Sequence, residues 1–104
     1  MVVYSIERVP GKEIAALGYV SGGAVMSKHF GRDIAASLKN IVGGELRGYT
    51  EMLQEARTLA VSRVEAEAVN LGADAVVGLH FTMTSWPDGA TGLMAYGTAV
   101  KVLG

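Results

Sequence analysis

The segment Tyr49–Leu79, YTEMLQEARTLAVSRVEAEAVNLGADAVVGL, changes its hydrophobic period part-way along. For about six turns apolar residues recur every three or four positions, which predicts an amphipathic helix over residues 49–71. Gly72 stands where a glycine ends a helix in the left-handed conformation. Arg63 and Glu67 lie four positions apart and are expected to pair with each other on the helix flank. The apolar face comprises Tyr49, Leu53, Ala56, Ala60, Val64, Ala68 and Leu71.

After Gly72 the period drops to two, the spacing of a strand with two different faces. Trp86-Pro87-Asp88-Gly89-Ala90-Thr91-Gly92 is rich in turn residues, and a second alternating run follows over residues 93–103. The two runs predict a β-hairpin with a loop longer than two residues. The apolar face of the first run comprises Val77, Leu79, Phe81 and Met83, opposite Gly78, His80, Thr82 and Thr84.

Upstream of the helix the sequence predicts two strands and a further helix. Residues 2–6 form a β-rich run closed by the turn Pro10-Gly11, and residues 13–25 predict a strand whose glycines mark bulges or close contacts. Asp33 is placed to cap a helix that Gly43-Gly44 ends. The order β-β-α-α-β-β over one domain, residues 1–104, predicts a two-layer α+β fold. Helices would cover one face of a mainly antiparallel sheet.

Composition excludes several classes of protein. Half of the 104 residues are hydrophobic, 18% are charged, and the formal net charge is −1, which excludes disorder and a polybasic nucleic-acid or membrane-surface domain. A cytoplasmic location is expected, since there is no cysteine, no signal-peptide pattern and no stretch near the ~18 apolar residues of a membrane span. Globular domains average about 25% charged residues, so the low charge favours surfaces covered by other copies.

Few residues offer chemistry. His29 and Asp33 would share a face if residue 29 were helical, and together with His80 they are the candidate ligands for a divalent metal ion. For each histidine the alternative is a packed or hydrogen-bonded structural role. No nucleophile–base–orienter set can be named, so no catalytic residue is assigned and no enzyme is expected. Trp86 is a candidate for a ligand or subunit contact, or folds back on its own hairpin.

Several motifs taken together resemble the YbjQ-like family of small bacterial and archaeal proteins. They are Ile41-Val42-Gly43-Gly44, Gly18-Tyr19-Val20-Ser21-Gly22, residues 71–78 (LGADAVVG) and residues 97–101 (GTAVK). The resemblance implies a dodecin-like arrangement assembled as a homopentamer, with no known enzymatic activity and a heavy-metal-binding label. Gly23 and Thr50 stand where members often carry carboxylates.

The resemblance also assigns roles to small residues. Gly78 is interpreted as a strand position crowded by the preceding helix, and Asp74 is expected to cap or pair locally. Ala95, Gly97 and Ala99 would let another layer approach the sheet.

Two functional hypotheses follow from these observations. The first is a non-enzymatic, cytoplasmic homo-oligomer that binds a small ligand or metal ion between subunits, without nucleic acid or membrane as a partner. The alternative is an interaction module whose ring presents the loop Trp86-Pro87-Asp88-Gly89 to another protein.

Overall fold

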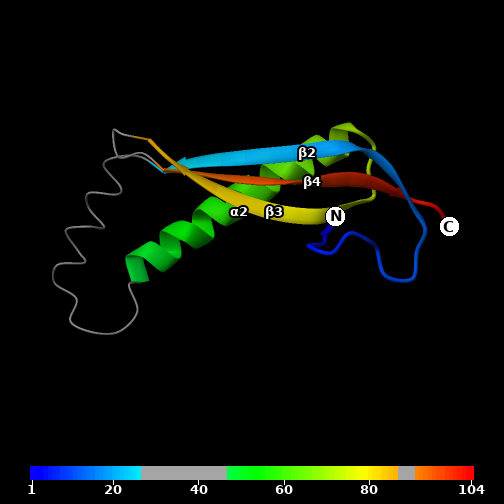
Figure 1. Cartoon of the computed structure of the whole chain (residues 1–104), viewed down its shortest axis with the longest axis horizontal. Coiled ribbons are helices and arrows are strands. Elements are labelled where there is room, and N and C mark those ends of the chain that lie inside the picture. The colour runs from blue at the N-terminus through cyan, green and yellow to red at the C-terminus, as the bar shows by residue number, and fades with distance from the viewer. Residues whose placement is uncertain (27–46, 87–90) are drawn as a thin grey trace.

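The computed structural model describes residues 1–26, 47–86 and 91–104. They form a four-stranded sheet with one long helix packed on one face, so the predicted α+β class is confirmed (Figure 1). The helix predicted after Asp33 lies outside the described residues. The described elements are β1 (Val2–Val3), β2 (Ile14–Met26), α2 (Arg47–Asn70), β3 (Ala75–Ser85) and β4 (Thr91–Val102).

The strand order in the sheet is β1-β3-β4-β2. The predicted hairpin is confirmed, since β3 pairs antiparallel with β4 from Ser85↔Thr91 onward, and β4 also pairs antiparallel with β2. Only the short β1 runs parallel to its neighbour, β3. The predicted first strand, residues 2–6, is wrong in length, because the chain leaves the regular ladder after Val3 and makes individual backbone bonds to β3 instead.

Helix α2 ends as the sequence predicts. Gly72 has φ = 78°, and the Ala73 and Gly72 amides donate to the carbonyls of Ala68 (3.0 Å) and Val69 (2.9 Å), the pattern of a Schellman motif. Its buried face differs from the prediction, because Leu53 and Leu71 are exposed. The row that packs on the sheet is spaced by four and consists of Met52, Ala56, Ala60, Val64 and Ala68.

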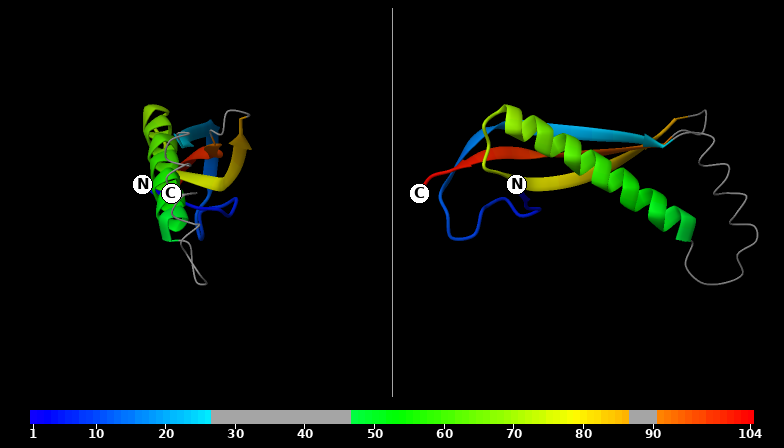
Figure 2. Two further views of the ribbon diagram at one scale, coloured as in Figure 1. Left: turned by 90° about the vertical axis from the view of Figure 1, so that its left-hand side faces the viewer. Right: turned by 180° about the vertical axis from the view of Figure 1, so that it is seen from behind.

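The core lies between α2 and the sheet and is built from small side chains. Val20 and Ala24 of β2 and Ala95 and Ala99 of β4 are buried beneath the helix row. The sequence interpretation that Ala95 and Ala99 admit another layer is correct, but that layer is the chain's own helix. Seen from behind, α2 runs diagonally across the sheet, and the end-on view shows β3 curving away from it (Figure 2).

The predicted Arg63–Glu67 pair is not the interaction that the structure shows. The Arg63 guanidinium donates to the backbone carbonyl of Gly23, and the Ser21 amide donates to the Glu67 carboxylate at 3.4 Å. Both side chains therefore reach the outer edge of β2, which has no strand neighbour on that side in the described sheet. An edge strand offers unpaired amides and carbonyls, and these two side chains bond to one of each.

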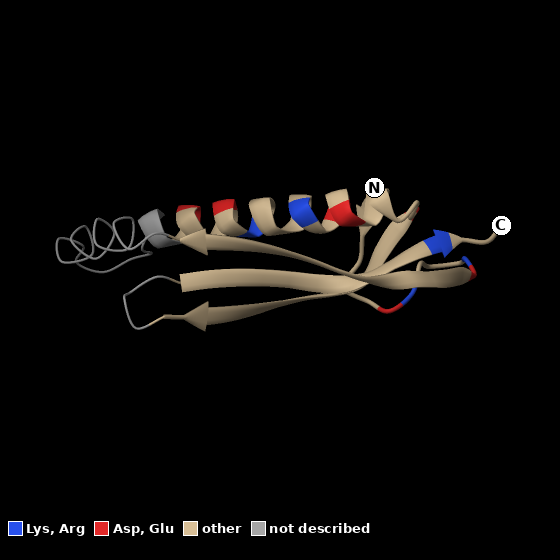
Figure 3. Ribbon diagram, turned by 90° about the horizontal axis from the view of Figure 1, so that it is seen from above, with Lys and Arg blue, Asp and Glu red and all other residues tan. Residues whose placement is uncertain are grey.

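Charge is distributed unevenly between helix and sheet. The strands β2, β3 and β4 contain a single lysine, Lys101, and no other Lys, Arg, Asp or Glu, while α2 carries charges of both signs (Figure 3). The sheet face opposite α2 is therefore made of uncharged side chains.

Among the described helices, none combines the length and the apolar character needed to cross a lipid bilayer.

Candidate functional site

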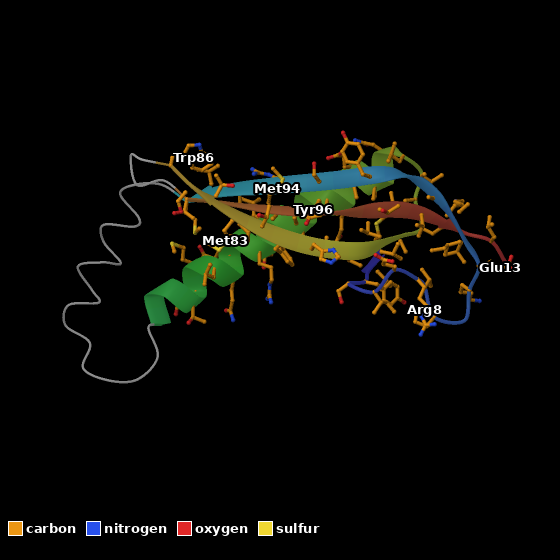
Figure 4. The ribbon with its side chains drawn as sticks, in the orientation of Figure 1. Arg8, Glu13, Met83, Trp86, Met94 and Tyr96 are labelled. Atoms are coloured by element: carbon orange, nitrogen blue, oxygen red, sulfur yellow. The ribbon has the colours of Figure 1, made fainter. Side chains whose placement is uncertain are left out.

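The described residues cover the sheet face opposite α2 at one end only. Tyr4, Val9 and Ile14 pack there against a small buried cluster of Ala75, Val77 and Val100. The rest of this face, which we call the open face, is turned to the viewer in Figure 4 with α2 behind the sheet. It includes Tyr96 and Met94 of β4, both partly exposed.

A β-bulge shapes the middle of the open face. Val77 pairs with Thr98 and His80 with Tyr96, so Gly78 and Leu79 together stand opposite Gly97. Gly78 has φ = 64°, a conformation that glycine adopts without strain. A Cβ on Gly97 would lie 2.9 Å from the Val77 carbonyl oxygen, so the bulged strand needs glycine opposite it. The interpretation that the preceding helix crowds Gly78 is wrong; the bulge explains that glycine.

The N-terminal segment satisfies the amides of the bulge. The Gly78 amide donates to the Ile6 carbonyl at 2.7 Å, and the Leu79 amide donates to the Tyr4 carbonyl at 3.0 Å. These bonds place Glu7 beside the bulge, where its Cγ would lie 3.7 Å from a Cβ on Gly78. A carboxylate from the start of the chain is thereby held at the centre of a sheet face that has no acidic residue of its own.

His80 and Tyr96 form a ring pair next to the bulge. Their ring centroids are 5.9 Å apart and the ring planes differ by 22°, an offset stacked arrangement. The His80 Nδ1–H donates to the Gly78 carbonyl at 2.7 Å, because a carbonyl oxygen can only accept. The Nε2 atom lies on the opposite side of the ring and takes no part in this bond.

Glu7, His80 and Tyr96 border a groove of about 600 Å³ on the open face. Tyr19 of β2 stands on its other side with 81% of its surface exposed. Glu7 is the only Asp, Glu, Lys or Arg among the lining residues. The others that line the groove are Ile14, Ala16, Val77, Gly78, Gly97, Thr98 and Val100. The groove is the site at which the described residues gather polar, aromatic and charged groups.

The described residues do not bring together the ligands of the predicted metal site. Of its three candidates, His29 and Asp33 lie outside residues 1–26, 47–86 and 91–104, and His80 is placed on β3. Within those ranges no cluster of three or more His, Asp or Glu side chains could hold a metal ion. A metal ion at His80 would therefore need further ligands from outside the described residues.

Asp74 pairs locally, as expected. Its carboxylate accepts from the Val102 amide at 2.8 Å and from the Lys101 ammonium at 3.3 Å. The amide hydrogen bond, followed by the bond and charge of Lys101, lowers the pKa of this carboxyl below its ordinary value. Asp74 thus ties the start of β3 to the end of β4 and lies apart from the groove.

Trp86 rests on its own hairpin. A Cβ on Gly92 would lie 2.9 Å from the Trp86 Cη2 atom, so the indole lies over this glycine at the distal end of the sheet, where Figure 4 labels it. The alternative that the sequence left open, a tryptophan folded back on its hairpin, is the one that the structure shows. Residues 87–90 of the loop lie outside the described residues.

Known proteins similar in sequence show which family the chain belongs to. A family model described as "Putative heavy-metal-binding" matches residues 1–103. The chain belongs to the YbjQ-like family. YbjQ-like relatives include a UPF0145 protein of Vibrio campbellii, 56% identical over 99% of this chain and 100% of its own length. Another UPF0145 protein, from Thermotoga maritima, is 54% identical over 98% of this chain and 97% of its own length.

A solved structure supports the YbjQ-like fold. It is a crystal structure of a protein of unknown function from the DUF74 family of Pediococcus pentosaceus. It aligns with a TM-score of 0.71 over 99% of this chain and 98% of that chain, at 14% identity. The resemblance seen in the sequence is confirmed as to family and fold, and the names of these relatives specify no substrate.

Proposed function

We propose that this YbjQ-like chain is a non-enzymatic homo-oligomer that binds a small ligand on the open face of its sheet. The observation that carries the assembly is the distal half of β3. From His80 to Ser85 this strand has no neighbour on its outer side in the described sheet, because β1 and residues 4–6 pair only with its first half. An exposed strand edge of this length is a template for pairing with another chain.

Side chains beside this edge are apolar and exposed. Phe81 and Met83 pair with Ala95 and Leu93, whose side chains face α2, so they lie on the helix side of the sheet. Helix α2 packs mainly on β2 and β4, which leaves Phe81 42% and Met83 55% exposed. A second copy that pairs with the edge would cover them and extend the core across the junction.

The two edges of the sheet differ in a way that supports one docking surface. Arg63 and Glu67 bond to the outer edge of β2, whereas the described residues place no charged side chain of β3 on its distal edge. Natural sheets use charged side chains to block unwanted strand pairing. We therefore propose that copies associate through β3. The homopentamer and the cytoplasmic location remain predictions from the sequence.

Native mass spectrometry at micromolar concentration tests the assembly and counts its subunits. Phe81→Lys should shift the protein toward monomer, because a lysine at the junction would be desolvated. Leu59→Lys is the matched control, since Leu59 is 42% exposed on α2 and lines a hollow with Val25 and Met26 of β2, the strand at the opposite edge of the sheet. A monomeric wild-type protein would defeat the assembly, and an oligomer that tolerates Phe81→Lys would defeat β3 as its surface.

The alternative, an interaction module that presents the loop after Trp86, stays a prediction. The contact of Trp86 with Gly92 gives this side chain a role within its own hairpin, and 44% of its surface remains exposed. Capture of a partner protein that is lost in Trp86→Ala while the oligomer stays intact would favour the module instead.

A further inference from the structure

We propose that the groove on the open face binds a flat organic cation, held by the aromatic groups and the Glu7 carboxylate around it. This inference deepens the ligand-binding part of the proposed function and does not depend on assembly. All the groups that it uses come from the described residues of one chain.

Three rings cross the sheet beside the groove, one from each long strand. His80 of β3 pairs directly with Tyr96 of β4, and their rings are stacked. Tyr19 of β2 pairs with Thr98, the same-face neighbour of Tyr96, so the two tyrosines are diagonal neighbours across β2 and β4. Diagonal neighbours lie about 7–8 Å apart, within reach of aromatic side chains. The arrangement offers ring faces to a flat ligand.

The exposure of these rings is itself an observation to explain. Tyr19 is 81% and Tyr96 45% exposed, although the sheet around them contains no charged residue apart from Lys101. Tyrosine combines a large apolar surface with a polar hydroxyl, and it is enriched where proteins bind ligands and partners. The Tyr96 ring is partly fixed by stacking on His80, so it loses little conformational entropy when a ligand covers it.

Charge selects the sign of the ligand. Glu7 is the only lining residue that is Asp, Glu, Lys or Arg, and the Ile6–Gly78 backbone bond holds its segment against the groove. An anionic ligand would meet this carboxylate with no Lys or Arg among the described lining residues to offset it. A cation gains the carboxylate and also the negative faces of the tyrosine rings, which attract positive charge within about 6 Å.

The composition of the lining favours an organic cation over a metal ion. The lining supplies one imidazole and one carboxylate as metal ligands, fewer than the four of a tetrahedral zinc site. The remaining lining side chains are aliphatic, aromatic or hydroxyl groups, with Ile14, Ala16 and Val100 forming an apolar floor that would desolvate a flat ring.

Isothermal titration with N-methylquinolinium as the probe tests the proposal, with quinoline, which is neutral near neutral pH, as the uncharged comparison. The cation should bind saturably at one site per chain, and quinoline should bind about tenfold more weakly or worse. Absence of saturable binding by the wild-type protein, or equal affinity for the two probes, would overturn the proposal.

Substitutions at Tyr96 and Glu7 test where the cation binds. Tyr96→Leu and Glu7→Gln should each weaken binding of N-methylquinolinium by about three- to tenfold, and Tyr96→Phe should retain it because the ring remains. Glu13→Gln is the matched control, since Glu13 does not line the groove. Unchanged affinity in Glu7→Gln, which removes a surface charge without removing packing, would overturn the role of the carboxylate.

Native mass spectrometry of the same samples separates the two proposals. Binding of the cation by a monomeric protein would defeat the assembly and support the site. An intact oligomer that does not bind the cation would support the assembly and defeat the site.

Discussion

Gly22 of β2 lies directly against the backbone of α2 at Ala60. A Cβ on Gly22 would stand 2.4 Å from the Ala60 carbonyl oxygen and 2.8 Å from the Val64 amide nitrogen. Backbone atoms in a regular helix cannot move aside singly, so this contact fixes how closely helix and sheet approach. The core between them can then be filled by alanine and valine.

Gly22→Ala should lower the free energy of unfolding by about 1–3 kcal/mol, the usual cost of overpacking. Gly23→Ala is the control one residue away, because its Cβ would meet the flexible end of Met94 at 3.4 Å and the Leu93 carbonyl oxygen at 3.9 Å, an ordinary contact distance. Urea denaturation of both variants measures the difference. Equal stability of the two variants would contradict the close contact between Gly22 and α2.

The bonds from α2 to the edge of β2 lead to a second prediction. Replacing Arg63 and Glu67 together by methionine should cost about 1–3 kcal/mol of stability, as two hydrogen bonds at roughly 0.5–1.5 kcal/mol each. It should also expose the β2 edge and increase association beyond that of the wild-type protein, as measured by light scattering. Arg57→Met on the same helix is the control and should leave both readouts unchanged.

Asp74 predicts an acid-side loss of stability. The pKa of this carboxyl is lowered in the folded chain from 3.8, so its ionised form stabilises the fold above that pH, and the contribution disappears as pH falls through the folded value. Asp74→Asn should therefore be less stable than wild type at neutral pH, with the difference shrinking in acid. Urea denaturation of Asp74→Asn and wild type at neutral and at acidic pH measures this difference, with Glu51→Gln as the control. A difference independent of pH would contradict it.

The metal hypothesis predicts a dependence on histidine. If the oligomer holds a divalent ion, calorimetric titration with Zn²⁺, Cu²⁺ or Ni²⁺ should give saturable heat, and His80→Ala should weaken binding at least about tenfold. His29→Ala tests the other candidate in the same way. Heat that neither substitution changes, or no saturable heat at all, would rule out the histidines as ligands.

The helix and hairpin could be predicted because their signals are local. The 3.6-residue period placed a helix over 49–71, against Arg47–Asn70 in the structure, and Gly72 marked its end. Leu53 was assigned to the buried face because it fits the period. Its exposure reflects tertiary packing, since only the row spaced by four, which includes Ala56 and Ala60, approaches the sheet.

The site depends on pairings between distant residues and was harder to predict. A hairpin centred on residue 88 would have paired His80 with Tyr96, as the structure does, so the ring pair was within reach of the alternation pattern. The position of Glu7 was not, because it follows from bonds between the bulge at Gly78 and a segment some seventy residues earlier. Likewise, helix spacing suggested an Arg63–Glu67 pair and gave no sign of the strand edge that binds both.

The bulge at Gly78 also has a consequence for the order of folding. The hairpin of β3 and β4 is local and closes a short loop, whereas the Tyr4–Leu79 and Ile6–Gly78 bonds require the start of the chain to meet a strand some seventy residues later. These bonds follow a β1 of only two residues. The N-terminal segment can therefore detach from β3 without unfolding the hairpin. Amide hydrogen exchange at Gly78 and Leu79 should therefore be faster than in the middle of β4. The wall of the groove that carries Glu7 is therefore expected to form late and to open early.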